Sequence, residues 1–179
     1  MLLETERLLL RRIRLSDTDA LYRLHCDPLV VRLTTDGHAM TQRQSDKRLD
    51  LYLEEWTRFG FGFFIVYEKQ PNGDLHFSGR CGLRNFNGAD VELGYCFAGA
   101  SSGRGLATEA AKSVIHDAFS RLALERLVGV VRPTNNQSQR VLEKLGFSYR
   151  EIINHRGVDY RFYELTPFMT GASLRTKSR

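Results

Sequence analysis

A glycine-rich segment in the middle of the chain has residue types that can hold a phosphate. Residues 98–105 read Ala-Gly-Ala-Ser-Ser-Gly-Arg-Gly, and an apolar helical pattern follows directly. Gly103 and Gly105 allow backbone N–H groups to approach a ligand closely. The dipole of the following helix favours negative charge at its start. This combination predicts a phosphate or pyrophosphate site; the alternative is a flexible, solvated turn.

Two common phosphate-binding patterns do not fit this segment. A P-loop needs Gly-Lys followed by Ser or Thr, and no such sequence follows Gly105. The dinucleotide fingerprint begins well with Gly103 and Gly105, but Thr108 stands where Gly or Ala is required. Glu125 lies about 20 residues further on, before the next strand rather than at its end. Both patterns are therefore disfavoured.

The elements around the glycines form one supersecondary unit. A strand over 91–97, a helix over 105–121 and a nearly all-apolar strand over 127–131 have the spacing of a parallel β-α-β crossover. A last helix over 136–145 begins after a capping residue, Asn135, and stops at Gly146. The glycine segment thus lies at the carboxyl end of one strand and at the N-terminus of a helix.

The rest of the chain predicts strands and helices on either side of this unit. A first strand is expected over 8–15, and two helices follow that begin near Ser16 and Thr41. The remaining strands are expected over 61–67, 77–83, 147–153 and 158–165. The order β-α-α-β-β-β-α-β-α-β-β predicts an α/β chain with a mixed sheet.

Composition limits the partners of this protein. The chain has 179 residues, of which 42% are hydrophobic and 26% charged, as in ordinary globular proteins. Its formal net charge is +5, but Arg175, Lys177 and Arg179 at the extreme C-terminus supply three of those charges. The remaining chain does not have the composition of a nucleic-acid-binding protein. A mild positive balance suits an anionic small ligand instead.

The cysteines and the N-terminus indicate the compartment. The three cysteines are scattered and show neither a disulfide pattern nor metal-ligand spacing; they are Cys26, Cys81 and Cys96. We therefore expect reduced thiols in a cytoplasmic protein and no metal site. Charged residues interrupt the leucines of the N-terminal segment, so we expect neither a signal peptide nor a membrane span there.

Several segments resemble the GNAT superfamily of N-acetyltransferases. The resemblance lies in Glu92-Leu-Gly94-Tyr95, Gly103-Arg-Gly105-Leu-Ala107-Thr-Glu109-Ala110 and Asn135-x-x-Ser138-x-Arg140-Val-Leu-Glu143-Lys144-Leu-Gly146-Phe147. The opening Glu4-Thr5-Glu6-Arg7-Leu8-x-Leu10-Arg11 and Gly82-Leu83 are similar to its RimL-type branch, the ribosomal-protein-like N-acetyltransferases. The resemblance covers residues 1–166.

The resemblance implies a fold and a domain organisation. The GNAT fold, of class α/β (α+β), is a mixed, mostly antiparallel twisted sheet of about seven strands with a central parallel β-α-β crossover and about four helices. Residues 1–168 would form a single N-acetyltransferase domain, and residues 169–179 a disordered basic tail.

The resemblance also implies the cofactor, acetyl-CoA. The family pattern Gln/Arg-x-x-Gly-x-Gly/Ala falls on residues 102–107, where the diphosphate of coenzyme A is expected. Ser102 departs from this pattern, and Arg104 is expected to supply charge. The pantetheine arm would lie between the strands 91–97 and 127–131, with a backbone N–H near Cys96 or Phe97 polarising the thioester carbonyl. The expected cofactor-binding residues are Cys96, Phe97, Ser102, Gly103, Arg104, Gly105, Leu106, Ala107, Thr108, Asn135 and Ser138.

The expected reaction is direct attack of a primary amine on the thioester. The acceptor would be a protein N-terminal amine or a small amine. Glu92, beside the thioester, is the expected general base, directly or through water; the alternative is a salt-bridged strand carboxylate. Ser138 is the first candidate for the acid that protonates the leaving thiol, and Tyr95 is the second. Alternatively, Ser138 only satisfies backbone groups in the first turn of its helix.

Other residues and functions stay open at this point. Trp56 and Phe59 are possible pocket residues, although an aromatic cluster at a helix–strand junction is usually core. His155 in the last hairpin could reach the acceptor, although we favour a solvated turn residue. We interpret Cys96 as a small apolar strand residue rather than a nucleophile. The alternative functions are a non-catalytic acyl-CoA-binding sensor with the same fold, or a domain that has lost the cofactor site. We expect a monomer or a homodimer that binds neither nucleic acid nor membrane.

Overall fold

One mixed sheet forms the framework of the computed structural model, which describes residues 1–34 and 37–167. Within them the strand order is β1-β2-β3-β4-β5-β6-β8-β7, and neighbours are antiparallel except for the parallel pair β5 and β6. The strands are β1 (Leu2–Glu4), β2 (Leu8–Arg12), β3 (Phe63–Lys69), β4 (Leu75–Phe86), β5 (Asp90–Phe97), β6 (Leu127–Val131), β7 (Ser148–His155) and β8 (Val158–Leu165). The predicted mixed, mostly antiparallel sheet is confirmed.

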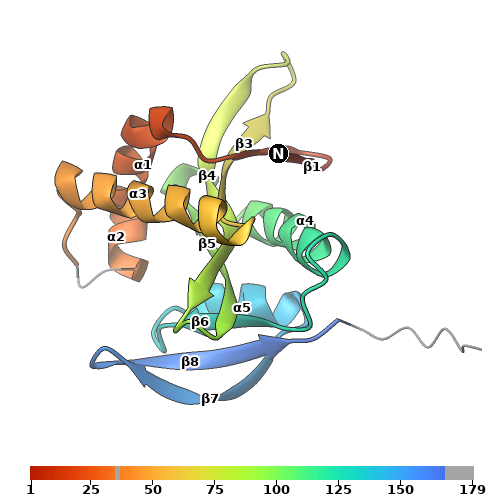
Figure 1. Ribbon diagram of the computed structural model, residues 1–179. Coiled ribbons are helices and arrows are strands. Elements are labelled where there is room, and N and C mark those ends of the chain that lie inside the picture. The colour runs from red at the N-terminus through yellow and green to blue at the C-terminus, as the bar shows by residue number, and fades with distance from the viewer. Residues whose placement is uncertain (35–36, 168–179) are drawn as a thin grey trace, which may run out of the picture.

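Five helices cover the sheet of the described residues. They are α1 (Thr18–His25), α2 (Pro28–Thr34), α3 (Gln42–Phe59), α4 (Leu106–Ser120) and α5 (Asn136–Lys144). Figure 1 shows α1 and α2 on one side of strands β4 and β5, and α4 on the other. The described residues thus hold eight strands and five helices, one of each more than the sequence predicted.

The central β-α-β crossover forms as predicted. Strand β5, helix α4 and strand β6 each begin and end within one residue of the expected positions. Helix α4 packs on β2, β4 and β5 through small and branched side chains that are fully buried, among them Ala110, Ala111, Val114 and Ala118. Small residues let the helix lie close to the sheet, which brings its N-terminus next to the end of β5.

Helix α3 has the cap that its sequence predicts. The Thr41 hydroxyl accepts a hydrogen bond from the Gln44 backbone, and the Gln44 side chain accepts one from the Thr41 N–H at 2.8 Å. The helix ends at Gly60, whose φ of +70° suits glycine. Near that end the indole of Trp56 is buried and donates to the Phe63 carbonyl at 2.8 Å. Trp56 is therefore a core residue and not a pocket residue.

Two glycines allow neighbouring side chains to pack closely against the backbone in the middle of the sheet. A Cβ at Gly94 in β5 would lie 2.8 Å from the ring of Phe63, and one at Gly129 in β6 would lie 2.8 Å from Leu142 of α5. Real Cβ atoms do not approach that closely, so a larger residue at either position would force the Phe63 ring or the Leu142 side chain to shift. Gly129 in particular allows α5 to pack directly on β6, which positions the first turn of that helix.

The N-terminal part differs from the prediction at two places. The strand expected over 8–15 ends at Arg12, because Asp17 accepts a hydrogen bond from the Arg14 N–H at 2.7 Å and starts a 3₁₀ turn there. Asp27 and Pro28 end α1 as expected, but they also begin α2. The Asp27 carboxylate accepts from the Leu29 N–H at 2.9 Å, and proline fits the first position of a helix.

Three further expectations concern the rest of the chain. Among the described residues, no helix combines the length and the apolar character needed to cross a membrane. In the same residues, no cluster of three or more His, Cys, Asp or Glu side chains offers a metal site. The expected basic tail, residues 169–179, lies outside the described part of the chain.

Candidate active site

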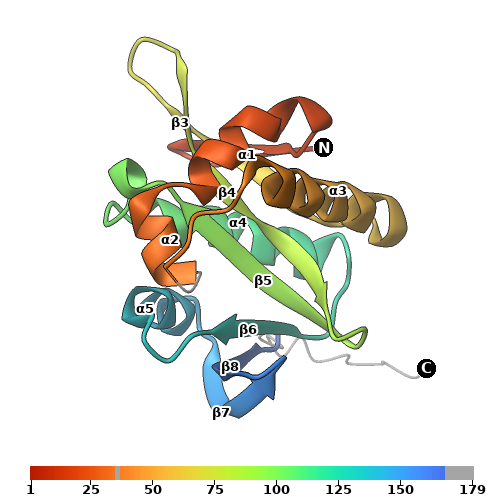
Figure 2. The ribbon, with the colours of Figure 1, turned by 90° about the vertical axis from the view of Figure 1, so that its left-hand side faces the viewer.

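The site begins where β5 and β6 separate. The two strands pair in register at a single position, Glu92 with Val128, and then diverge. Figure 2 shows the divergence, with α2 and α5 at the open end. Two cavities lie along this opening, which we call the loop cavity and the arginine cavity after their lining residues.

The loop cavity has a volume of about 310 Å³ and lies between α2, the loop 98–105, α4 and α5. Ten of the eleven expected cofactor-binding residues line it: Cys96, Phe97, Ser102, Gly103, Gly105, Leu106, Ala107, Thr108, Asn135 and Ser138. The residues that the family resemblance implied therefore lie together around one cavity.

Arg104 is the one expected cofactor-binding residue that does not line the loop cavity. The Arg104 guanidinium instead forms an ion pair with Glu68 at the end of β3, with an Nη1–Oε2 distance of 2.7 Å. Glu68 is buried, and a buried carboxylate needs a partner of opposite charge. In this structure the Arg104 side chain is therefore paired with Glu68, and its expected contact with a diphosphate stays a prediction.

The loop 98–105 has the backbone shape that an anion site needs. Gly103 and Gly105 have φ values of +77° and +80°, and α4 with its 15 residues begins directly afterwards. A Cβ at Gly103 would meet no atom within 4 Å. Glycine therefore suits this position because of its positive φ, and open space lies beside it. The amides at the start of α4 and this open space fit the diphosphate of coenzyme A.

A contact between distant motifs fixes the start of α4. The Glu109 carboxylate accepts hydrogen bonds from the Thr5 hydroxyl at 2.6 Å, from the Arg7 N–H at 3.0 Å and from the Arg7 Nε at 2.7 Å. Burial would raise the pKa of Glu109, but the bonds from Thr5 and Arg7 outweigh it and lower that pKa. The segment between β1 and β2 thus ties down the helix that carries the anion site.

Tyr95, Asn135 and Ser138 lie where the two cavities meet, since all three line both of them. The Tyr95 hydroxyl is 2.9 Å from the Ser138 hydroxyl and donates to the Ser138 carbonyl at 3.0 Å. Asn135 caps α5 by accepting from the Ser138 N–H at 3.0 Å. Burial raises the pKa of Tyr95 well above its ordinary value, so this phenol keeps its proton at neutral pH.

The end of β5 presents one backbone N–H to the opening. The Ala98 N–H donates to the Ser78 carbonyl of β4 at 3.0 Å. Successive amides of a strand point to alternate sides, so the Phe97 N–H points away from β4, toward β6. Of the two amides expected near the thioester, Phe97 has the suitable direction and Cys96 does not. Burial raises the pKa of the Cys96 thiol, which agrees with its reading as an apolar strand residue.

The arginine cavity, of about 360 Å³, lies on the other side of this meeting point. Its charged lining residues are Arg48, Arg80, Arg84, Glu92, Arg132 and Arg156. Glu92 is only 4% exposed and pairs with Arg84, whose Nε and Nη2 atoms lie 2.7 Å and 2.6 Å from its Oε2 atom. Both contacts fall on Oε2, so Arg84 leaves Oε1 unused.

The electrostatics of Glu92 are compatible with a proton acceptor. Burial raises the pKa of its carboxyl, and Arg84 offsets part of that effect. A raised pKa makes a carboxylate a stronger base. The ion pair with Arg84 is the alternative that the sequence left open, and the structure contains it. The unused Oε1 atom keeps the base role chemically accessible as well.

Sequence reasoning missed several residues of both cavities. Helix α2 was not foreseen, yet its residues 29, 30, 33 and 34 line the loop cavity. The arginines of the arginine cavity were missed because they come from four separate places in the chain: α3, β4, the segment after β6 and the β7–β8 hairpin. One signal was present: Arg80 and Arg84 are four residues apart on one strand and therefore share a face.

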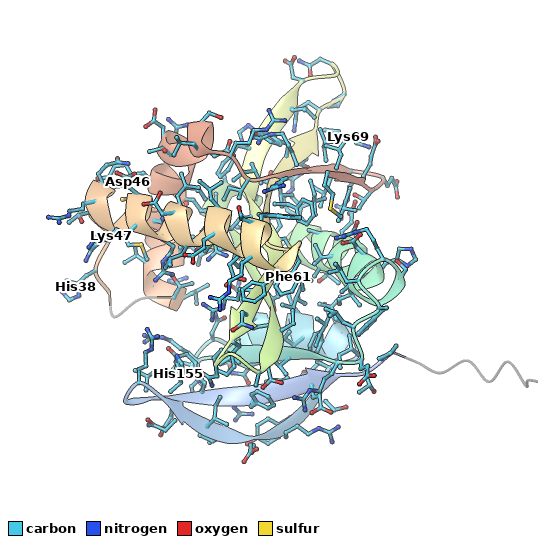
Figure 3. All side chains as sticks on the ribbon, viewed as in Figure 1. His38, Asp46, Lys47, Phe61, Lys69 and His155 are labelled. Atoms are coloured by element: carbon cyan, nitrogen blue, oxygen red, sulfur yellow. The ribbon has the colours of Figure 1, made fainter. Side chains whose placement is uncertain are left out.

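His155 and Phe59 both line cavities, which was expected as a possibility for Phe59 but differs from the solvated turn expected for His155. His155, labelled in Figure 3, lies on the β7–β8 hairpin and lines the arginine cavity. Its ring packs against Phe86 with a centroid distance of 5.0 Å, so it is not a solvated turn residue. Phe59 lines a third cavity, which shares Arg48, Arg84 and His155 with the arginine cavity.

Comparison with known proteins places these features in a family. A family model described as "Acetyltransferase (GNAT) domain" matches residues 7–148. The N-acetyltransferase p20 of Bacillus licheniformis is 32% identical over 147 residues, which are 81% of each chain. The crystal structure of an acetyltransferase from Agrobacterium tumefaciens superposes with a TM-score of 0.80 at 26% identity, covering 93% of this chain and 95% of that one.

A RimL ribosomal L7/L12 α-N-protein acetyltransferase in complex with coenzyme A is also similar. Its TM-score is 0.77 at 16% identity, and the match covers 93% of this chain and 98% of that one. At this identity the likeness shows a shared fold.

Proposed function

Because the chain belongs to the GNAT acetyltransferase family, we propose that it is an acetyl-CoA-dependent N-acetyltransferase that transfers an acetyl group directly to a primary amine. The observation that carries the proposal is the meeting of two cavities at Tyr95, Asn135 and Ser138. One cavity has the loop suited to a diphosphate, and the other contains a carboxylate and space for an acceptor. The opening between β5 and β6 connects them.

Each residue around the opening has a proposed task. When bound, acetyl-CoA supplies the acetyl group as an activated thioester. The amides of residues 103–107 and the start of α4 hold the diphosphate. The Phe97 N–H donates to the carbonyl oxygen of the acetyl group, as in an oxyanion hole. Asn135 fixes the first turn of α5 and contacts the cofactor arm.

Proton transfers fall to residues on the two sides of the opening. Glu92 accepts a proton from the attacking amine through Oε1, directly or through water. Tyr95 and Ser138 share a hydrogen bond, and we propose that this pair donates the proton to the leaving sulfur. The raised pKa of Tyr95 supports the role, because it keeps the hydroxyl protonated at neutral pH.

The RimL-type branch is the proposed place of this chain within the family. The opening segment supports it, since Thr5 and Arg7 of that motif bind Glu109 of the cofactor motif. The similar RimL structure holds coenzyme A, which agrees with the cofactor proposed here. The acceptor would then be a protein N-terminal amine or a small amine. The three cysteines are free, which supports the cytoplasm as the compartment.

Thiol release from acetyl-CoA tests this proposal. The purified protein is incubated with acetyl-CoA and a panel of peptides with free N-termini and small amines, and free thiol is measured. We expect saturable release that requires an amine, and N-acetylated product by mass spectrometry. Binding of acetyl-CoA by calorimetry with no turnover on any amine would favour the non-catalytic sensor instead.

A further inference from the structure

The arginine cavity carries an excess of positive charge. Its wall contains five arginines, from α3, β4, the segment after β6 and the β7–β8 turn. Among the described residues, Glu92 is the one carboxylate in that wall, and it is already paired with Arg84. An ammonium group alone would enter such a cavity at an electrostatic cost.

Arg80 is the most constrained of these cations. Its guanidinium carbon lies 4.3 Å from the ring centroid of Phe63 and 5.0 Å from that of Tyr52. Its Nε atom is buried and has no hydrogen-bond partner, and no described carboxylate pairs with it. Stacking on two rings holds the guanidinium in place, while its Nε–H donor has no hydrogen-bond partner among the described residues. Buried hydrogen-bond donors in proteins normally have an acceptor, and a bound ligand would supply the one that Arg80 lacks.

Glu92 interacts electrostatically with Arg80 across the cavity, but His25 and Arg48, which also lie near Arg80, do not offset its charge. His25 is buried, its Nδ1 atom lies 2.8 Å from the Ser45 hydroxyl, and its Nε2 atom has no partner in the described residues. Burial, together with the charges of Arg80 and Arg48, lowers the pKa of His25 to about 3. His25 is therefore neutral at physiological pH. Arg48 lies near Arg80 and His25, and no described carboxylate forms a salt bridge with Arg48.

We infer that the acceptor carries an anionic group, a carboxylate or a phosphate, besides its amine, and that Arg80 and Arg48 bind this group. The inference rests on the proposed N-acetyltransferase function. Guanidinium groups bind such oxyanions through paired, charge-assisted hydrogen bonds. The same cations lower the pKa of a nearby amine and so increase the fraction that is neutral and able to attack.

Matched pairs of acceptors test the inference. An α-amino acid is compared with its amide, and phosphoethanolamine with ethanolamine, by thiol release from acetyl-CoA. Within a pair the amine is retained and the anionic group is removed. We expect at least one anionic member to be preferred about tenfold or more in kcat/KM, with a preference that weakens as salt is added. The pair with the larger ratio distinguishes carboxylate from phosphate.

Variants of Arg80 assign the effect to this residue. We expect Arg80→Gln to raise KM for the anionic acceptor about tenfold while KM for acetyl-CoA is unchanged, and Arg80→Lys to restore part of the loss. Arg43→Gln is the matched control, because Arg43 is exposed on α3 and lines neither cavity. Circular dichroism melts of all three variants verify that they fold.

Failure of the inference and failure of the proposed function give different results. If neutral and anionic acceptors react equally and Arg80→Gln leaves their ratio unchanged, the inference is overturned and the N-acetyltransferase stands. If acetyl-CoA binds and no amine reacts, the proposed function fails. In that case inorganic phosphate is titrated with coenzyme A saturating: a rise in Tm for the wild type but not for Arg80→Gln supports an anion site, and equal rises refute it.

Discussion

Tyr95 connects the two sides of the site through a single hydroxyl group. The hydroxyl contacts both oxygen atoms of Ser138, and Tyr95 lies in the walls of both cavities. Its position follows from two features of the sequence: Tyr95 belongs to β5, and Asn135 starts α5 three residues before Ser138. Chemistry at this point therefore depends on how β5 and α5 are placed.

Removing the Tyr95 hydroxyl should slow the reaction. We expect Tyr95→Phe to lower kcat about tenfold with little change in KM for acetyl-CoA, because a thiol with a pKa of about 8.5 needs only modest help to leave. If the Tyr95 hydroxyl is the group that protonates the sulfur, Ser138→Ala should lower kcat less than Tyr95→Phe does. Steady-state kinetics measure both, with the exposed Tyr149→Phe as control. Unchanged kcat in both variants would remove the pair from the mechanism.

Glu92 should set the acidic limb of the pH profile. The base is active when deprotonated, and burial raises its pKa, so activity should fall with decreasing pH at a value above that of an ordinary glutamate. We expect Glu92→Gln to lower kcat/KM about 100-fold and to abolish this limb. A profile of kcat/KM against pH measures the effect. If the variant retains the wild-type limb, Glu92 serves only as the partner of Arg84.

Part of the site could be read from the sequence at the residue scale. Glu92, Tyr95, the two glycines and Ser138 could be assigned to the site from local motifs. Each of them lies in a short contiguous segment whose backbone has a role in the site. The fate of Arg104 could not be read, since it depends on Glu68, which is 36 residues away along the chain. Arg48 and Arg80 were missed for the same reason: only the packing of α3 on β4 brings them together.

At the scale of elements, the cofactor motif depends on the N-terminal segment. Thr5 and Arg7 bind Glu109 across about 100 residues of chain, so the start of α4 is held from outside the crossover. This contact gives the opening motif a physical task that its sequence alone does not reveal.

Weakening that contact should affect both stability and cofactor binding. We expect Glu109→Gln to destabilise the fold by about 1 kcal/mol, after allowance for the exposure of Arg7, and to raise the Kd for coenzyme A a few-fold. Asp117→Asn is the control, because Asp117 pairs with Arg121 within the same helix. Denaturation and calorimetry measure the two effects. Equal changes in both variants would mean that the tie to the N-terminal segment is unimportant.

The stability difference between the wild type and Glu109→Gln should depend on pH in a defined direction. The folded pKa of Glu109 is lowered, so its contribution is fully present above the ordinary carboxyl pKa and is lost as pH falls through the folded value. The stability gap between wild type and Glu109→Gln should therefore close in acid.

Elements with a clear apolar pattern were predicted better than elements without one. The boundaries of α4 and β6 were within one residue, because a one-sided apolar helix and an apolar strand have clear periodicity. Strand β1 has three residues and α2 has seven, too few to show a period. In α2 the proline that ends the preceding helix is also an acceptable first residue of the next one, and the sequence does not decide between these roles.

At the scale of the whole molecule, coenzyme A should stabilise the folded protein. A ligand at 100 times its Kd that binds only the native state adds about 2.7 kcal/mol, which raises Tm by about 5–10 °C for a protein of this size. Thermal shift measures this change. Pantetheine, which lacks the nucleotide diphosphate, is the control and should give a smaller rise. No shift with coenzyme A would contradict the assignment of the loop 98–105.

The single residue pair between β5 and β6 divides the sheet into two hydrogen-bonded blocks, β1–β5 and β6–β8–β7. Hydrogen–deuterium exchange should reveal the boundary between these two blocks. Amides of β5 that face β4, such as that of Cys96, should exchange slowly with solvent deuterium, whereas alternate amides such as that of Phe97 should exchange quickly. Fast and slow sites would then alternate residue by residue along one strand, a labelling signature of a ladder that is complete on one side and open on the other.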